Sequence, residues 1–299
     1  MKTGIVLTVF FGLFSLSCSQ NISSKSQRTL LPAKVERATK AWENIPIIDA
    51  HIHTYFDGNK TQEGLLEEWK KAGVVGGVAH VGRDGSGYVD LKAQHVVHCA
   101  GMGEEVNALE LEAGLVAKKY GCIKIYLGYI HQYAYSEAYE PAYILAQKYQ
   151  VPVVFHTGDT YSTTAELKYA DPLTIDEVAV KHPQVTFVIA HCGNPWIESA
   201  AEVAYKNPNV YLDGSALLIG DLSRMAPEDI EAYVIRPLRW VYGYTEGSKK
   251  LMFGTDWPLT SVKPYLEAFK KAIPQEAWKD VFYNNAVRIF KIPGLNPLP

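Results

Sequence analysis

The chain has 299 residues, of which 47% are hydrophobic and 20% charged, and its formal net charge is −3 at pH 7. This length allows one large α/β domain or two medium ones. The 29 basic and 32 acidic residues are mixed, without a basic stripe or an acidic tail. The composition therefore argues against a nucleic-acid partner and favours a small-molecule substrate, and it leaves a homodimer open.

The N-terminal segment differs from the rest of the chain. Lys2 is the only charged residue among residues 1–20, and the apolar run over residues 5–16 is too short to cross a membrane. A serine before Cys18 resembles a bacterial lipoprotein processing site, although Leu16 lies one position later than usual. Plain secretion is the alternative.

We predict three regions from these features. A signal peptide of lipoprotein type covers residues 1–18, a polar tether covers 19–31, and a single domain covers 32–299. The protein is then exported and lipid-anchored at a bacterial membrane through Cys18, or otherwise periplasmic or secreted. The lipid anchor is the only membrane contact that the sequence predicts.

The remaining cysteines are Cys99, Cys122 and Cys192. Their number is odd, and each lies in or beside an apolar, strand-like run. This pattern favours buried small hydrophobic residues over a disulfide framework, despite the exported setting.

Apolar strand-like segments alternate with amphipathic helical segments along the domain. After a helix over 32–44, the predicted strands cover 47–53, 74–81, 95–100, 122–127, 151–155, 185–190, 210–212 and 250–254. The predicted helices cover 61–72, 104–120, 141–149, 172–181, 199–205, 226–240, 263–272, 275–282 and 284–290. This alternation predicts an α/β fold, a (β/α)8 TIM barrel with a short N-terminal helix and extra C-terminal helices. A doubly wound sheet is disfavoured because no Gly-rich turn follows the first strand.

Histidines and one aspartate stand at the ends of several predicted strands. His51 and His53 share one face of the first strand because side chains alternate along a strand. His156, His191 and Asp256 follow the fifth, sixth and eighth strands. The C-terminal strand ends of a TIM barrel form its active site, so these five side chains are expected to meet at one mouth. Two neutral imidazoles that converge from one strand end make half of a divalent-metal site.

The segments DAHIHT, VVFHTGD, IAHCGNP, GTDWP and NNAVRIF resemble the amidohydrolase superfamily over about residues 45–292. The similarity is to its amidohydrolase-related branch, of the aminocarboxymuconate-semialdehyde decarboxylase type. The resemblance implies that the metal ligands are His51, His53, His156 and Asp256. Three imidazoles and a carboxylate suit one divalent metal, by default Zn²⁺, with Mn²⁺ or Fe²⁺ as alternatives. It also implies that Asp256 and His191 move protons.

The resemblance implies a metal-dependent hydrolase, in which metal-bound hydroxide attacks the carbonyl of a small lactone, amide or ester. One alternative is non-oxidative decarboxylation of an aromatic or unsaturated carboxylic acid by the same metal shell. A second alternative is a non-catalytic lipoprotein that binds a metal or a ligand. The spare His191 argues against this second alternative, because a binding protein does not need it.

Four further residues are candidates for substrate binding: Lys124, Tyr126, His131 and Asp213. Superfamily members with two metals bridge them with a carbamylated lysine on the fourth strand. Lys124 could play that part, bind substrate, or be a structural lysine that points inward. Asp213 could instead orient a ligand histidine or cap its loop. Asp49 shares a face with His51 and is expected to support the site from below or to be satisfied within the core.

Overall fold

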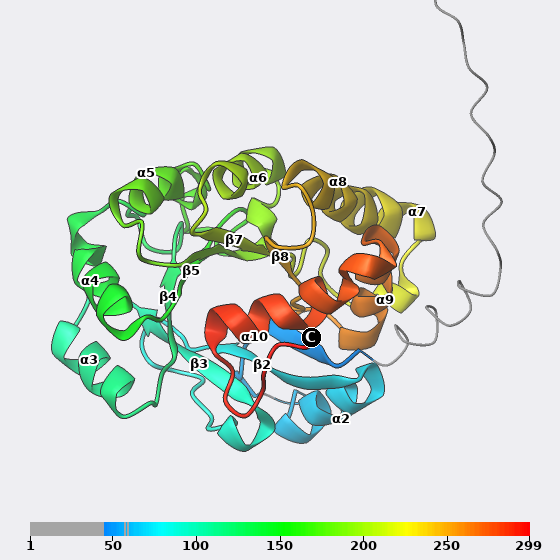
Figure 1. Cartoon of the computed structure of the whole chain (residues 1–299), viewed down its shortest axis with the longest axis horizontal. Helices are drawn as coiled ribbons and strands as arrows, with labels where there is room; N and C mark the ends of the chain where they lie inside the picture. The colour runs from blue at the N-terminus through cyan, green and yellow to red at the C-terminus, as the bar shows by residue number, and fades with distance from the viewer. Residues whose placement is uncertain (1–44, 57, 59) are drawn as a thin grey trace, which may run out of the picture.

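The computed structural model describes residues 45–56, 58 and 60–299. The predicted signal peptide, the tether and the helix over 32–44 lie outside these residues. Eight parallel strands form one sheet in the order β1 to β8, and they lie within a ring of helices (Figure 1). β8 returns to β1 through the Ile52–Trp257 bridge and a 2.9 Å hydrogen bond from Ala50 N to Phe253 O. The predicted TIM barrel is confirmed.

The bounds of the elements follow the predicted alternation. The strands are β1 (Ile47–Ile52), β2 (Val74–His80), β3 (Val96–Met102), β4 (Cys122–Tyr126), β5 (Val153–His156), β6 (Phe187–Ile189), β7 (Val210–Asp213) and β8 (Leu251–Met252). The helices are α2 (Gln62–Ala72), α3 (Ala108–Val116), α4 (Glu140–Tyr149), α5 (Thr174–Lys181), α6 (Ile197–Lys206), α7 (Pro227–Ile230), α8 (Arg236–Tyr244), α9 (Val262–Ala272) and α10 (Asn285–Phe290). Within the described part of the chain, no helix is both long and apolar enough to cross a membrane.

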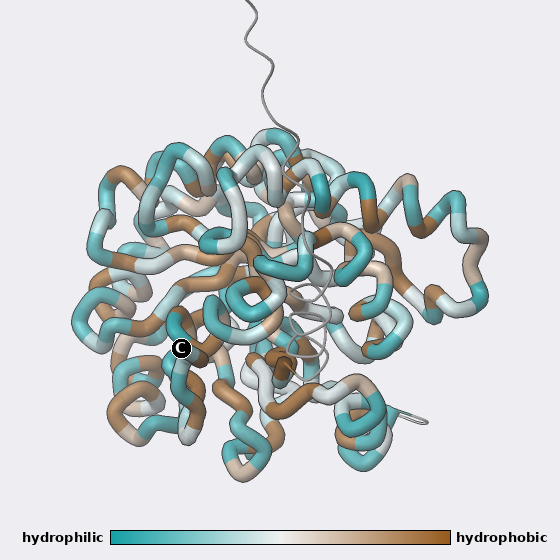
Figure 2. Tube along the Cα trace, turned by 45° about the vertical axis from the view of Figure 1, so that its right-hand side comes forward, coloured by the Kyte–Doolittle hydropathy of each residue, from teal (hydrophilic) through white to brown (hydrophobic). Residues whose placement is uncertain are grey.

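Helix α2 shows how local sequence sets these bounds. The Thr61 side chain accepts a hydrogen bond from Gly64 N and caps the first turn, while Gly73 ends the helix at φ 74°. Leu65 and Trp69 are buried on its inner face. The outer helices in general alternate hydrophobic and hydrophilic residues along the chain (Figure 2), as expected for helices that cover a sheet on one side.

The predicted helix over 104–120 is shorter in the structure, where α3 covers Ala108–Val116. The side chain of Asn107 accepts a hydrogen bond from Glu110 N and sets the start of α3.

An apolar layer fills the N-terminal end of the barrel. Ile48, Val78 and Val154 from the strands form one buried cluster with Val287 and Phe290 of α10. Helix α10 lies across the centre of the ring of strands (Figure 1) and closes this end. The opposite, C-terminal end is the one at which parallel barrels place their active sites.

Cys99 on β3 and Cys122 on β4 form a disulfide. The prediction that neither cysteine is paired was wrong. The two residues are 23 positions apart in sequence, but the register of the parallel strands places them opposite each other. The odd cysteine is Cys192, which is free and buried as predicted.

Candidate active site

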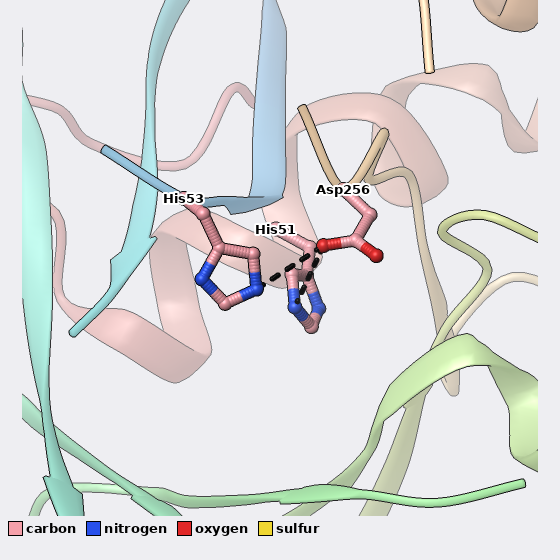
Figure 3. A group of neighbouring side chains, drawn as sticks. All are labelled: His51, His53 and Asp256. Carbon is pink, nitrogen blue, oxygen red and sulfur yellow. Dashed lines mark ion pairs between the residues drawn. The ribbon is translucent and has the colours of Figure 1, made fainter. Parts of the chain in front are cut away.

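His51, His53 and Asp256 converge at the C-terminal end of the barrel (Figure 3). The Oδ1 atom of Asp256 lies 3.2 Å from Nε2 of His53 and 3.6 Å from Nε2 of His51. The histidines lie on and just after β1, and Asp256 follows β8, the neighbouring strand across the closure of the barrel. The structure thus brings together residues that are more than two hundred positions apart in sequence.

Hydrogen bonds fix which nitrogen each ring turns toward Asp256. Nδ1 of His51 donates to Oδ2 of Asp213 over 2.9 Å, and Nδ1 of His53 donates to the carbonyl oxygen of His80 over 2.9 Å. Both Nε2 atoms therefore face Asp256. Burial holds the pKa of His51 well below its ordinary value, so this ring is neutral near pH 7.

The three residues fit a divalent metal ion. Nε2 of His51 and Oδ1 of Asp256 are buried and have no hydrogen-bond partner among the described residues, which is rare for buried polar atoms. A tetrahedral ion with ligand bonds of about 2.0–2.2 Å separates its ligand atoms by roughly 3.3 Å. The distances of 3.2 and 3.6 Å are close to that separation. Two imidazoles and a carboxylate suit zinc, manganese or iron, and do not select one of them.

His156, the fourth predicted ligand, faces His191 instead of this group. Its Nε2 donates to the carbonyl oxygen of Asp159 over 2.9 Å, and its Nδ1 lies 3.2 Å from Nε2 of His191. Burial holds the pKa of His156 well below its ordinary value. The neutral ring thus directs the Nδ1 lone pair at His191. The role of His156 as a metal ligand stays a prediction.

The two predicted proton-transfer residues have unusual backbone conformations. His191 has φ 59° and Asp256 has φ 60°, in the left-handed region that residues other than glycine rarely adopt. Such strain costs on the order of 1–3 kcal/mol per residue and is concentrated at functional sites. Burial lowers the pKa of His191. Burial alone would raise the pKa of Asp256, but His51, His191 and His53 outweigh it and hold that pKa below its ordinary value.

Lys124 lies inside the barrel and is fully buried, and its Nζ has no hydrogen-bond partner among the described residues. Burial lowers its pKa to about 8, against the opposing effect of Asp213 and Asp256. These three side chains carry a summed charge of −1 when ionised. A bound divalent ion would change the sum to +1, and an anion from substrate or water would then balance it. All three alternatives for Lys124 remain open.

The other predicted substrate-binding residues have different surroundings. Tyr126 is buried and donates to the carbonyl oxygen of Val81 over 2.7 Å. His131 is exposed and lies 2.9 Å from the carbonyl oxygen of Thr164, outside the group in Figure 3. Asp213 is buried and contacts His51. It therefore orients this histidine, which is one of the alternatives that the sequence left open.

Asp49 belongs to the seam between β1 and β8. Its carboxylate accepts hydrogen bonds from Thr255 N over 2.9 Å and from Thr255 Oγ1 over 2.6 Å. The sequence left open whether Asp49 supports the site from below or is satisfied within the core, and the structure shows the second arrangement. Burial raises its pKa to about 7, against the opposing hydrogen bonds from Thr255.

A cavity of about 380 Å³ lies among the loops that follow β1 to β4. Tyr55 lines it and stacks on His53 with ring centroids 5.5 Å apart. Arg83 also lines it and donates to the carbonyl oxygen of Tyr129, whose ring lies 4.9 Å from that of His156. Tyr55 thus connects the cavity with His53, and Arg83 connects it with His156 through Tyr129.

Sequence reasoning missed two residues of the site. His80 ends β2, its ring centroid lies 4.0 Å from that of His51, and neither ring nitrogen has a partner among the described residues. The rule that selected the other strand-end histidines would have found it. Ser215 contacts both Asp213 and His191. It lies in a loop, and no sequence pattern distinguishes it.

Solved structures share the fold at low sequence identity. A probable 2-pyrone-4,6-dicarboxylic acid hydrolase from Acinetobacter baumannii, with citric acid bound, is 14% identical, with a TM-score of 0.60 over 82% of this chain and 99% of its own. An amidohydrolase from Burkholderia multivorans with bound zinc is 15% identical, with a TM-score of 0.60 over 83% and 100%. A 5-carboxyvanillate decarboxylase from Sphingomonas paucimobilis is 12% identical, with a TM-score of 0.59 over 83% and 99%.

The family comparison covers most of the chain. No curated protein matched the sequence. A family model described as amidohydrolase matches residues 34–292, which include every predicted site residue. The resemblance inferred from the strand-end motifs is thereby confirmed. The chain belongs to the amidohydrolase family and is an enzyme of that family.

Proposed function

We propose that this enzyme hydrolyses a lactone, amide or ester bond in a small molecule, with one divalent metal ion as cofactor. The proposal is carried by two buried atoms that have no partner in the described part of the chain, Nε2 of His51 and Oδ1 of Asp256, beside the neutral His191. A divalent ion held by His51, His53 and Asp256, with His156 as the proposed fourth ligand, supplies carbonyl polarisation and a lowered pKa of water.

The chain's own residues supply proton transfer. The Asp256 carboxylate lies within the ligand group and is placed to accept a proton from water. His191 has a neutral ring near pH 7, because burial lowers its pKa. Its imidazole can take a proton and return it to the leaving oxygen or nitrogen. Burial of both groups excludes bulk water from these transfers.

The cavity beside His53 supports a small substrate. Tyr55 offers an aromatic face and a hydroxyl, and Arg83 offers a cation at the same cavity. A small cyclic ester matches the aromatic face of Tyr55, and the Arg83 cation shares the lining with the carboxylates of Asp84 and Glu104. The 2-pyrone ring named for one structurally similar hydrolase is a cyclic ester of this kind. We propose that Lys124, Tyr126, His131 and Asp213 contribute to substrate binding.

A turnover experiment in ¹⁸O water tests the reaction type. Lactones, esters, amides and aromatic acids are screened first with protein loaded with zinc or manganese. Hydrolysis places the label in the acid that forms, and H191Q should then lose most of the activity. Release of CO₂ without incorporation of the label would establish decarboxylation and overturn the proposal.

We also propose that the protein is exported and lipid-anchored through Cys18. The Cys99–Cys122 disulfide supports export, because such bonds persist mainly in oxidising compartments. Metabolic labelling with a radioactive fatty acid in a bacterial host should mark the wild type and not C18A. An unlabelled wild-type protein in the soluble fraction would contradict the anchor.

A further inference from the structure

A second cavity, of about 160 Å³, lies at the N-terminal end of the barrel. Its wall comes from the segments that lead into β5 and β6, from β7, and from the end of α10. The polar residues of the wall are Gln150, Gln184, Thr186, Tyr211, Arg288 and Lys291. The candidate active site lies at the opposite ends of the same strands, so the two sites share no residue.

Two cations line this cavity, and none of its lining residues carries a carboxylate. Nη2 of Arg288 donates to Oδ1 of Asn285 over 2.6 Å, and Nζ of Lys291 donates to the carbonyl oxygen of Gln150 over 2.7 Å. Both acceptors are neutral. Neither cation takes part in an ion pair with another described residue. Each therefore keeps its charge uncompensated and has further N–H groups to offer a ligand.

A third cation, Lys250, lies behind this wall. Its Nζ is 5.0 Å from the centroid of the Tyr211 ring. It donates to the carbonyl oxygens of Asn207, Pro208 and Val210 over 2.8, 3.1 and 2.9 Å, so its three N–H groups are used and only its charge acts on the cavity. A concave site lined by one sign of charge concentrates the field. The chain as a whole has a net charge of −3, so the positive charge here is local.

The neutral side chains of the wall add hydrogen-bond donors. Oε1 of Gln184 accepts from Nε2 of Gln147 over 2.9 Å, which leaves the NH₂ group of Gln184 to donate elsewhere. The hydroxyls of Thr186 and Tyr211 can also donate. Arginine and lysine surrounded by neutral donors suit a phosphate group. The cavity of about 160 Å³ has room for such a group, since one water occupies about 30 Å³.

We propose that this cavity is a binding site for a phosphate-sized oxyanion, held by Arg288, Lys291 and Gln184. The ligand joins the end of α10 to the segment that leads into β6. It therefore stabilises the folded chain by mass action. The site is independent of the reaction at the other end of the barrel.

The test is a calorimetric titration of the full chain with inorganic phosphate, against sodium chloride of equal ionic strength. The wild type should show one saturable site per chain with phosphate and none with chloride. Q184E places a carboxylate in the wall, and its side chain can still accept from Gln147. K291Q removes one cation. Each variant should bind phosphate at least about tenfold more weakly, as for the loss of a hydrogen bond to a charged group.

Two matched controls make the same charge changes at exposed residues outside the cavity. Q275E corresponds to Q184E, and K263Q corresponds to K291Q. Both should bind phosphate as the wild type does. So should D256N, which separates this cavity from phosphate bound at the metal group.

Three results would overturn the proposal. The first is a wild type without saturable phosphate binding. The second is a variant of the wall that binds as tightly as its control. The third is loss of binding in D256N, which would assign the phosphate to the candidate active site. None of these results depends on which reaction the enzyme catalyses.

Discussion

Oδ2 of Asp213 lies 2.9 Å from Nδ1 of His51, and both side chains are buried. This contact joins the end of β7 to the end of β1 and fixes the tautomer of His51. A carboxylate that accepts the distal N–H of a histidine orients the ring and raises its basicity toward a metal. Asp213 thus orients His51, and it also belongs to a second group that could hold a metal ion, with His51 and His191.

D213N should weaken zinc binding by about 10- to 100-fold. The amide can still accept from His51 but no longer supplies a negative charge. Competition with a chromophoric chelator measures the change. D176N is the control, because Asp176 pairs with Lys206 on the surface at 2.6 Å. Equal zinc affinity in D213N and D176N would mean that Asp213 does not support the site.

H191Q should lower kcat by about 10²- to 10⁴-fold, the usual contribution of general acid–base catalysis. Glutamine keeps hydrogen-bonding capacity, but it cannot carry a proton near pH 7. Zinc content should stay at the wild-type level, because the proposed ion is held by His51, His53 and Asp256 and not by the second group that could hold a metal ion, His51, His191 and Asp213. Loss of zinc in H191Q would reassign His191 as a ligand.

The sequence predicted the fold and the strand-end residues because both follow from periodicity. His51 and His53 lie two positions apart and share one face of the first strand. The later site residues each follow an apolar run at the end of a strand, so barrel topology alone brings these side chains together. The Cys99–Cys122 pairing depends on the register between β3 and β4, which no spacing encodes. The contacts of Ser215 with Asp213 and His191 depend on a loop conformation. The contact between His156 and His191 depends on the rotation of the two rings. Neither could be predicted from the sequence.

Asp49 should make stability depend on pH. Its ordinary pKa is 3.8, and burial raises it to about 7 in the folded protein. Between these values the unfolded chain has released a proton that the folded chain retains. The free energy of unfolding therefore falls as pH rises from about 4 to 7, by at most about 1.4 kcal/mol per pH unit.

D49N should lack this pH dependence of the free energy of unfolding, because its amide mimics the protonated acid. The amide oxygen accepts from Thr255 N, and the NH₂ group donates to Thr255 Oγ1. Urea unfolding of both proteins from pH 4.5 to 7.5 measures the difference. Parallel stability curves would show that Asp49 is ionised in the fold throughout this range.

The double variant C99A/C122A should be less stable than the wild type by about 3 kcal/mol, since the disulfide closes a loop of 23 residues. Chemical unfolding of oxidised wild type and variant gives this difference. Intact mass before and after reduction under denaturing conditions checks the bond itself. A wild-type mass that does not increase on reduction would contradict the pairing.

Metal analysis of the wild type and of D256N, both purified without added metal, tests the central claim most directly. Asp256 supplies the carboxylate that lies 3.2 Å from His53 and 3.6 Å from His51. The account predicts about one divalent ion per chain in the wild type and little in D256N, with both proteins folded. A metal-free wild type that gains no metal on incubation, or a D256N variant that retains a full equivalent, would contradict it.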